Sequence, residues 1–300
     1  MPTRAWGMLL VLSVLWGGSF LFNRIAVAEI PTLTVVLSRV ALASALLLIA
    51  ARLTGVAMPA DARGWRDHLV MGVLNNIIPF VLIVWGQRTI GAGLASIFNA
   101  TTPIFGVIIA HLCTRDDKAT PLKAAGIAAA FLGVAVLVGL DALAGLGDHL
   151  AADLACLAAA VSYGFSALWS RRFRGRPPIA TAAGQLLCST ILLTPAVLLI
   201  DRPWTQPLPS AAAVAAVVAL AALSTAVAYI LFFRLTTLVG PTNTILVTFL
   251  IPPSAILLGI VVLGERPAPQ HFVGVALIGL GLAAIDGRLF RRWRRAPERA

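Results

Sequence analysis

The sequence of 300 residues is short of charge, cysteine and histidine, and each shortage excludes a class of protein. Charged residues make up 12% of the chain, which is roughly half of what soluble domains carry. The three cysteines lack the paired spacing of a metal or redox centre, and four histidines form no recognisable catalytic set. The glycine-rich phosphate loop of ATPases is also missing. The sequence therefore predicts no metal, no cofactor and no enzyme activity.

Hydrophobic residues, in contrast, make up 59% of the chain. They come in blocks of about 20 residues, the length that crosses ~30 Å of hydrocarbon. Unbroken blocks of this length are typical of helices, whereas strands of a membrane barrel are shorter and alternate. We expect an all-α integral membrane protein with ten transmembrane helices. The expected spans are 6–27, 31–52, 69–88, 91–113, 122–140, 152–171, 179–200, 211–234, 240–263 and 270–287.

The 23 lysines and arginines are distributed unevenly between the two sides of such a protein. With ten spans, the side that holds both termini receives eighteen of them, the other side receives four, and Arg39 lies within a span. Basic loops stay in the cytoplasm, so we expect a cell inner membrane protein with both termini cytoplasmic. The basic tail then anchors on anionic lipid. We expect the lipid bilayer, and not nucleic acid, as its partner.

One stretch of the sequence occurs twice, about 149 residues apart. Pro103 precedes Asp116 by 13 residues, and Pro252 precedes Glu265 by the same number. Each copy continues into a pair of glycines seven residues apart, a spacing that allows close helix packing. These glycines are Gly126 and Gly133 in the first copy, and Gly274 and Gly281 in the second.

The first spans of the two copies also match, because Trp16 and Ser19 correspond to Tyr163 and Ser166 at an offset of 147 residues. Five spans per copy is an odd number, so the second copy enters the membrane upside down. Transporters built from inverted repeats bind their substrate near the midplane, between the repeats. We expect a first five-helix repeat, an inverted second repeat and a basic cytoplasmic tail, at 1–143, 150–287 and 288–300.

Together these motifs resemble the EamA-type drug/metabolite transporter superfamily over residues 6–287. The residues that carry the resemblance are Trp16-Gly17-x-Ser19-Phe20, Arg39, Gly264-Glu265-Arg266, Gly274 and Gly281. The resemblance implies a central cavity formed by spans 1, 3, 4, 6, 8 and 9, and export of small metabolites, commonly amino acids. A subgroup that exports aromatic amino acids has a similar layout. The chain departs from the family at 115–117, where Arg-Asp-Asp stands in place of the frequent Gly-Glu.

Aromatic and small polar residues share one face of the first span and of the sixth. Trp16, Ser19 and Asn23 follow the helical spacing i, i+3, i+7. Trp16 and its counterpart Tyr163 lie about ten residues inside their spans, which favours a cavity wall over an interfacial belt. We therefore expect these and similar residues of neighbouring spans to bind substrate: Trp16, Ser19, Asn23, Asn76, Phe80, Trp85, Asn99, Tyr163, Ser166, Trp169, Tyr229 and Thr248.

Two prolines lie in the middle of the fourth and ninth spans. Pro103 and Pro252 free the backbone carbonyls of Asn99 and Thr248, which are repeat partners. Lipid offers no hydrogen bond to a freed carbonyl, so protein, water or ligand must cover it. We expect Pro103 and Pro252 to act as hinges beside the cavity; packing kinks are the alternative.

Arg39 lies eight residues into the second span, ~12 Å deep at the helical rise. An arginine at this depth is a functional candidate by default, with a substrate carboxylate as its possible partner. A structural bond to backbone carbonyls is the favoured alternative, because the residue resembles a family-wide feature. All twelve acidic residues fall in loops or at span ends. We therefore expect a secondary transporter without a buried-carboxylate proton relay.

Amino acids, with aromatic ones among them, head the expected substrates. Export of cationic drugs or nucleotide-type metabolites is the alternative, and an integral-membrane enzyme acting on lipid is a distant one. We expect a monomer or a weak dimer.

Overall fold

The computed structural model of the chain describes residues 2–115, 119–138, 147–254, 257–258 and 269–286, and these parts contain helices and no strand. Seven helical stretches are long and apolar enough to cross a membrane. In chain order they are Thr3–Val27 (α1), Thr32–Leu53 (α2), Ala62–Gly86, Ala92–Cys113, Leu150–Phe173, Pro178–Thr205 and Ala211–Val239.

The five stretches after α2 are each built from two or three consecutive helical elements, and further helices lie outside the seven stretches. The first half of the chain contains α3 (Ala62–Gly72), η1 (Val73–Ile77), α4 (Ile78–Gly86), α5 (Ala92–Asn99), α6 (Thr102–Cys113) and α7 (Pro121–Val138). The second half contains α9 (Leu150–Trp169), η2 (Ser170–Phe173), α10 (Pro178–Ala196), η3 (Val197–Asp201), η4 (Pro203–Thr205), α11 (Ala211–Ala221), η5 (Ala222–Val227), α12 (Ala228–Val239), α13 (Pro241–Thr244), η6 (Ile245–Phe249) and α15 (Pro269–Asp286).

The helical class expected from the sequence is confirmed, and the described helices fall on the expected spans. The third stretch begins at Ala62, seven residues before the expected start. Its first turn is polar, and Asp61 caps it by accepting a hydrogen bond from the Gly64 amide. Asp67, in the next turn, is buried beside Arg172. Hydropathy does not detect a polar helix end that other parts of the protein cover. The expected ninth span and the tail at 288–300 lie partly or wholly outside the described residues.

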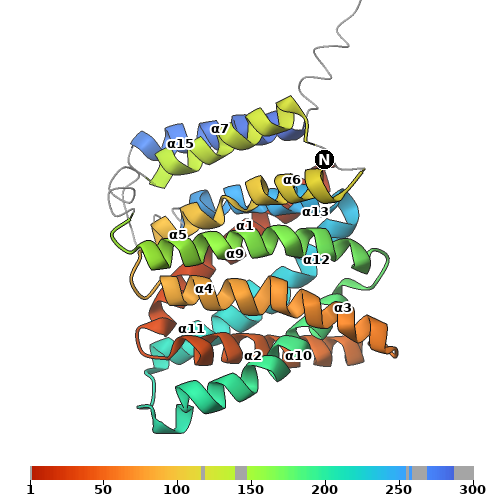
Figure 1. The fold of residues 1–300 in the computed structure, drawn as a ribbon, viewed down its shortest axis with the longest axis vertical. Coiled ribbons are helices and arrows are strands. Elements are labelled where there is room, and N and C mark those ends of the chain that lie inside the picture. The colour runs from red at the N-terminus through yellow and green to blue at the C-terminus, as the bar shows by residue number, and fades with distance from the viewer. Residues whose placement is uncertain (1, 116–118, 139–146, 255–256, 259–268, 287–300) are drawn as a thin grey trace, which may run out of the picture.

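The two halves of the chain are interleaved. In Figure 1, α2 and α10 cross in one layer, while α9 runs beside α4 and α6. Helices α11 and α12 from the second half pack on α1 from the first. Each half therefore places its third stretch against the opening helices of the other half, and the surfaces between the halves run through the centre of the molecule.

The third stretch of each half contains a π-helical turn at its middle. Residues of η1 connect α3 to α4, and residues of η5 connect α11 to α12. A π-turn inserts extra backbone into a helix and frees carbonyls from the regular ladder. Polar side chains of the opposite half occupy two of these carbonyls: Ser162 donates to the Leu74 carbonyl at 2.7 Å, and Trp16 donates to the Ser224 carbonyl at 3.2 Å.

The fourth stretch of the first half is broken, as its proline predicts. Helix α5 ends at Asn99, residues Ala100 and Thr101 form a turn, and α6 begins with Pro103 in its first turn. In the second half, α13 passes into the 3-10 turns of η6, and a further helical segment at 251–254 contains Pro252. Both interruptions lie among buried side chains.

Helices α7 and α15 form a separate pair at one end of the molecule (Figure 1). Four glycines let their backbones approach closely, as the seven-residue spacing predicts. A Cβ atom on Gly133 would lie 2.9 Å from the Gly274 carbonyl oxygen, and one on Gly126 would lie 2.8 Å from that of Gly281. Side chains at these positions therefore separate the pair.

Candidate functional site

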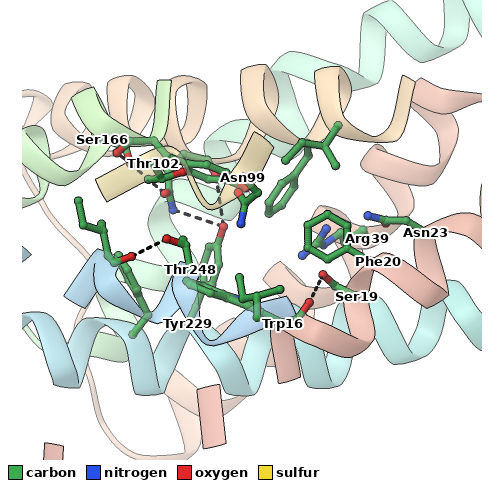
Figure 2. Close-up of a pocket in the computed structure, with 17 residues that line it drawn as sticks. Trp16, Ser19, Phe20, Asn23, Arg39, Asn99, Thr102, Ser166, Tyr229 and Thr248 are labelled. Atoms are coloured by element: carbon green, nitrogen blue, oxygen red, sulfur yellow. Dashed lines mark hydrogen bonds between the residues drawn. The ribbon is translucent and has the colours of Figure 1, made fainter. Parts of the chain in front are cut away.

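A cavity lies where the two halves cross. The first helices of both halves, α1 and α9, supply part of its wall, and the irregular third and fourth stretches supply most of the rest (Figure 2). About 60 Å³ is open to the centres of water-sized molecules, which is room for a few waters. Its lining residues are Trp16, Ser19, Phe20, Asn23, Arg39, Asn75, Phe80, Ile83, Asn99, Thr102, Tyr163, Ser166, Tyr229, Phe232, Ile245, Thr248 and Ile251.

Nine of the twelve residues that the sequence predicts to bind substrate lie on this cavity. They are Trp16, Ser19, Asn23, Phe80, Asn99, Tyr163, Ser166, Tyr229 and Thr248. They come from both halves of the chain and are separated by up to 232 positions in sequence. The sequence periodicity therefore identified faces that the fold brings together; that these residues bind substrate stays a prediction.

The other three predicted residues, Asn76, Trp85 and Trp169, do not line the cavity. Asn76 is fully buried behind its wall, where it donates to Ser189 Oγ at 2.9 Å. Trp85 is 43% exposed on the outside of α4, where lipid surrounds a spanning helix. Trp169 donates its indole N–H to the Asp67 carbonyl at 3.1 Å. Its ring packs on the Arg172 guanidinium at 4.1 Å, near one end of the bundle.

On the first helix of the chain, contacts with the second half fix the position of Trp16. The Trp16 indole donates to the Ser224 carbonyl and packs on Phe232, with 5.6 Å between ring centroids. Ser19 and Ser166 each donate to a carbonyl of their own helix, three residues earlier. Both serines line the cavity.

Arg39 projects from α2 into the cavity wall and is 3% exposed. Its Nε donates to Thr225 Oγ1 at 2.7 Å, and its Nη2 donates to the Ser224 carbonyl at 3.4 Å. The guanidinium carbon lies 3.8 Å from the centroid of the Phe80 ring. The structural role that the sequence favoured for Arg39, a bond to a backbone carbonyl, is therefore present in one of its two hydrogen bonds. The shorter bond, however, goes to a side-chain hydroxyl on the π-turn η5.

The opposite π-turn carries a neutral network. Tyr229 donates its hydroxyl to Asn76 Oδ1 at 2.7 Å and receives a bond from Asn75 Nδ2 at 3.3 Å. Asn75 also donates to Gln185 at 3.2 Å, and its Oδ1 lies 3.1 Å from Ser166 Oγ, whose one proton it shares with the Tyr163 carbonyl. These side chains are buried and hold α9, α10 and α12 against η1.

Apart from Arg39, which the sequence marked by its depth in the second span, the lining residues outside the twelve predicted ones fall into two groups. Asn75 and Thr102 are polar and stand next to Asn76 and Pro103, so their neighbours carried the signal. The π-turn places Asn75 on the cavity and its neighbour behind it. The others are apolar and have no sequence signal of their own: Phe20, Ile83, Phe232, Ile245 and Ile251.

The charge of the cavity is set by Arg39. Among the described residues, no carboxylate lines the cavity, and none lies within ion-pair distance of that guanidinium. The buried carboxylates Asp67 and Asp153 belong to the second turn of α3 and the first turn of α9, near the ends of spans. Within the same residues, no cluster of histidine, cysteine or acidic side chains is arranged to hold a metal ion.

Repeated apolar helices around a central, partly polar cavity are typical of a multi-pass membrane transporter. Two segments of the chain, residues 4–139 and 150–285, each match the EamA-like transporter family. The chain belongs to this family.

Relatives support this assignment, and a solved structure shares the fold. A probable terminal-alkyne amino-acid exporter of Streptantibioticus cattleyicolor is 29% identical over 298 residues, covering 97% of this chain and 96% of the relative. An uncharacterized inner membrane transporter, YedA of Escherichia coli, is 24% identical over 287 residues, covering 95% and 92%. A protein crystal structure matches with a TM-score of 0.76 at 19% identity, over 97% of this chain and all of the other. This last likeness concerns the fold alone.

Proposed function

We propose that this protein is a secondary transporter of the inner membrane that exports amino acids or closely similar metabolites. In this proposal ten transmembrane helices form two inverted five-helix repeats, residues 1–143 and 150–287. Both termini and the tail at 288–300 are cytoplasmic, in line with the eighteen basic residues on that side.

The observation that carries the proposal is the cavity, whose wall is built from equivalent positions of both halves. Trp16 and Tyr163 are equivalent residues of the opening helices, and Asn99 and Thr248 are equivalent residues beside the two interruptions. A site shared by two repeats is exposed to opposite sides of the membrane when the repeats rock against each other. Pro103 and Pro252, at the interruptions, are the proposed hinges.

Three features favour an amino acid as the substrate. The cavity combines aromatic walls with neutral hydrogen-bonding groups, a surface suited to a small, partly apolar molecule. It contains a guanidinium and no described carboxylate, which disfavours cationic drugs. A relative that covers almost the same length is a probable exporter of an amino acid. The aromatic walls extend the proposal to aromatic amino acids.

The coupling follows from the same charge distribution. Proton-driven transporters keep an ionisable relay within the membrane, and the described part of this cavity carries no acid or histidine. We therefore propose facilitated transport, or coupling that does not use a buried carboxylate. An imposed pH gradient is expected to leave substrate accumulation in proteoliposomes unchanged.

Counterflow tests the proposed function directly. The pure protein is reconstituted in proteoliposomes at equal pH on both sides, and labelled L-alanine, L-leucine, L-threonine, L-phenylalanine and L-tryptophan are offered against the unlabelled amino acid inside. We expect saturable exchange of some members, with competition by others. Absence of exchange across the whole panel would refute amino-acid transport and leave the fold assignment intact.

A further inference from the structure

The Arg39 guanidinium has unused hydrogen-bonding capacity on the side of the cavity. A guanidinium carries five N–H donors, and Arg39 uses one on Nε and one on Nη2. Its Nη1 makes no hydrogen bond to the residues that the structure describes, yet it is not among the unpartnered nitrogen and oxygen atoms that are sealed from solvent. Because Arg39 lines the cavity, this free end is where a small molecule in the cavity meets the positive charge.

The environment of Arg39 leaves its charge without a counter-ion. Its hydrogen-bond acceptors, Thr225 and Ser224, are neutral, and the Phe80 face contributes only a cation–π contact. Buried charges are costly unless they are paired, and an intramembrane arginine otherwise finds a carboxylate or a row of carbonyls. Within the parts of the chain that the structure describes, the missing anion is not supplied by the protein.

Arg24 shows what a purely structural arginine looks like in the same protein. It lies near the end of α1, is exposed, and donates from Nη1 to the Gln87 carbonyl at 2.6 Å. Its charge is close to the loop between α1 and α2, where water and lipid head groups are within reach. Arg39 has neither the exposure nor the polar surroundings of Arg24, so packing alone does not account for a charge at that position.

An unpaired acceptor lies toward the same end of the cavity as Arg39. Asn23 lines the cavity, and its Oδ1 is sealed from solvent with no hydrogen-bond partner among the described residues, while its Nδ2 donates to Gln87. Asn23 precedes the end of α1 by four residues and Arg39 follows the start of α2 by seven. At the helical rise their depths below the connecting loop differ by only about 5 Å. Figure 2 shows both side chains on one side of the cavity.

We infer that Arg39 and Asn23 form the head-group site for an α-amino acid. The Arg39 guanidinium binds the α-carboxylate, and Asn23 Oδ1 accepts a hydrogen bond from the α-ammonium group. The substrate side chain then extends toward the neutral end of the cavity, among Tyr163, Ser166 and Thr248. This inference rests on the proposed function, and it narrows the substrate class to small molecules with a free carboxylate.

Matched ligands test the head-group site on the unaltered protein. L-Leucine and L-phenylalanine are compared with leucinamide and phenylalaninamide, which keep the side chain and the amino group but lack the carboxylate. Competition for counterflow is measured, together with the rise in melting temperature that a ligand of the folded state produces. We expect each amide to compete at least about tenfold more weakly than its acid, since a charge-assisted hydrogen bond is lost.

Variants then assign the preference to Arg39. Arg39→Gln is expected to remove the discrimination between acid and amide, and Arg39→Lys, which keeps a point charge but not the planar fork, to retain part of it. A merely structural arginine would lower stability and rate for acid and amide alike, with their ratio unchanged. Arg24→Gln is the matched control and is expected to keep the wild-type ratio.

The outcomes separate this inference from the function on which it rests. Exchange of amino acids with equally good competition by their amides would overturn the head-group site and leave the proposed function standing. No exchange and no thermal shift with any acid or amide would overturn both. A preference for acids that survives in a folded Arg39→Gln protein would assign carboxylate recognition to another group.

Discussion

The two π-turns occupy equivalent places in the two halves but present different chemistry to the cavity. At η5, the freed carbonyl of Ser224 accepts from Trp16 and from Arg39, and the resulting end of the cavity is cationic. At η1, the freed carbonyl of Leu74 accepts from the Ser162 hydroxyl at 2.7 Å, and the surrounding network is neutral. The two halves thus share the π-turn in the backbone, but the side chains around it differ between them.

This difference shows why an inverted repeat does not produce a symmetric site. Equivalent turns dock against opposite halves, so each one meets its own set of side chains from helices of the other half. The cavity between them has a charged end at Arg39 and a neutral end toward Ser166 and Thr248. A molecule with a carboxylate and an apolar body fits such a polarised cavity in one orientation.

Replacing Thr225 by valine breaks the charged end and should have the largest effect. Thr225 Oγ1 accepts from Arg39 Nε at 2.7 Å, and an isosteric methyl group leaves a charged donor unpaired. We expect a loss of roughly 1.5–3 kcal/mol in unfolding free energy and a counterflow rate at least about tenfold lower. Thr190→Val is the control, because Thr190 donates only within its own helix. Wild-type stability and transport in Thr225→Val would contradict this account.

Removing the Tyr229 hydroxyl breaks the neutral end. Tyr229→Phe leaves buried Asn76 Oδ1 without its 2.7 Å partner, so unfolding in detergent should become easier by roughly 1–3 kcal/mol. Asn76→Leu should have a comparable effect. Because the two residues share one bond, the double variant should lose less than the sum of the single variants. Strictly additive losses would show that this bond does not couple the halves.

Two serines test whether the π-turns are docked equally. Ser162 donates to the Leu74 carbonyl and Ser224 donates to the Leu15 carbonyl, each at 2.7 Å. Ser162→Ala and Ser224→Ala should each lower the unfolding free energy by ~0.6 kcal/mol, the average for such bonds between membrane helices. Ser44→Ala should cost nothing, because the buried Ser44 hydroxyl has no partner among the residues that the structure describes. Clearly unequal losses would place the stabilisation in one turn only.

The two halves also differ in the carboxylates that cap the starts of α2 and α11 outside the membrane, where we expect a smaller effect on stability. Asp201 accepts from the Thr34 amide at the start of α2, and Glu29 accepts from the Ser210 amide and hydroxyl at the start of α11, both amide bonds being 2.7 Å. The bonds from Ser210 lower the pKa of Glu29 below its ordinary value. The cap is therefore complete above the ordinary carboxyl range and is lost as the pH falls through the lowered pKa.

Thermal stability as a function of pH measures the Glu29 cap. The melting temperature of the wild type should exceed that of Glu29→Gln by a small, constant amount near neutral pH. The difference should shrink as the pH falls below the ordinary carboxyl range. A difference that grows on acidification would have the wrong sign for this cap.

Sequence patterns predicted the depth of the site residues better than the direction in which they point. Helical spacing brought Trp16, Ser19 and Asn23 to one cavity face, because α1 is a continuous helix. It gave no direction for Trp85, which lies on the outer face of α4 after a π-turn that rotates the following residues. The same turn places Asn75 on the cavity in place of Asn76. π-turns have no signature in hydropathy, so the directions of Asn75 and Trp85 could not be predicted from the sequence.

The most direct test of the central claim, that this cavity faces the two sides of the membrane in turn, is sided thiol labelling at Ser19. Ser19→Cys is conservative because Ser19 bonds only within its own helix; it is made after replacement of Cys113, Cys156 and Cys188 by alanine. We predict labelling by a membrane-impermeant reagent added to either side, with both rates lowered by a transported amino acid. Ser44→Cys, buried away from the cavity, should resist the reagent. Labelling of Ser19→Cys from one side only, unchanged by any transported amino acid, would contradict the account.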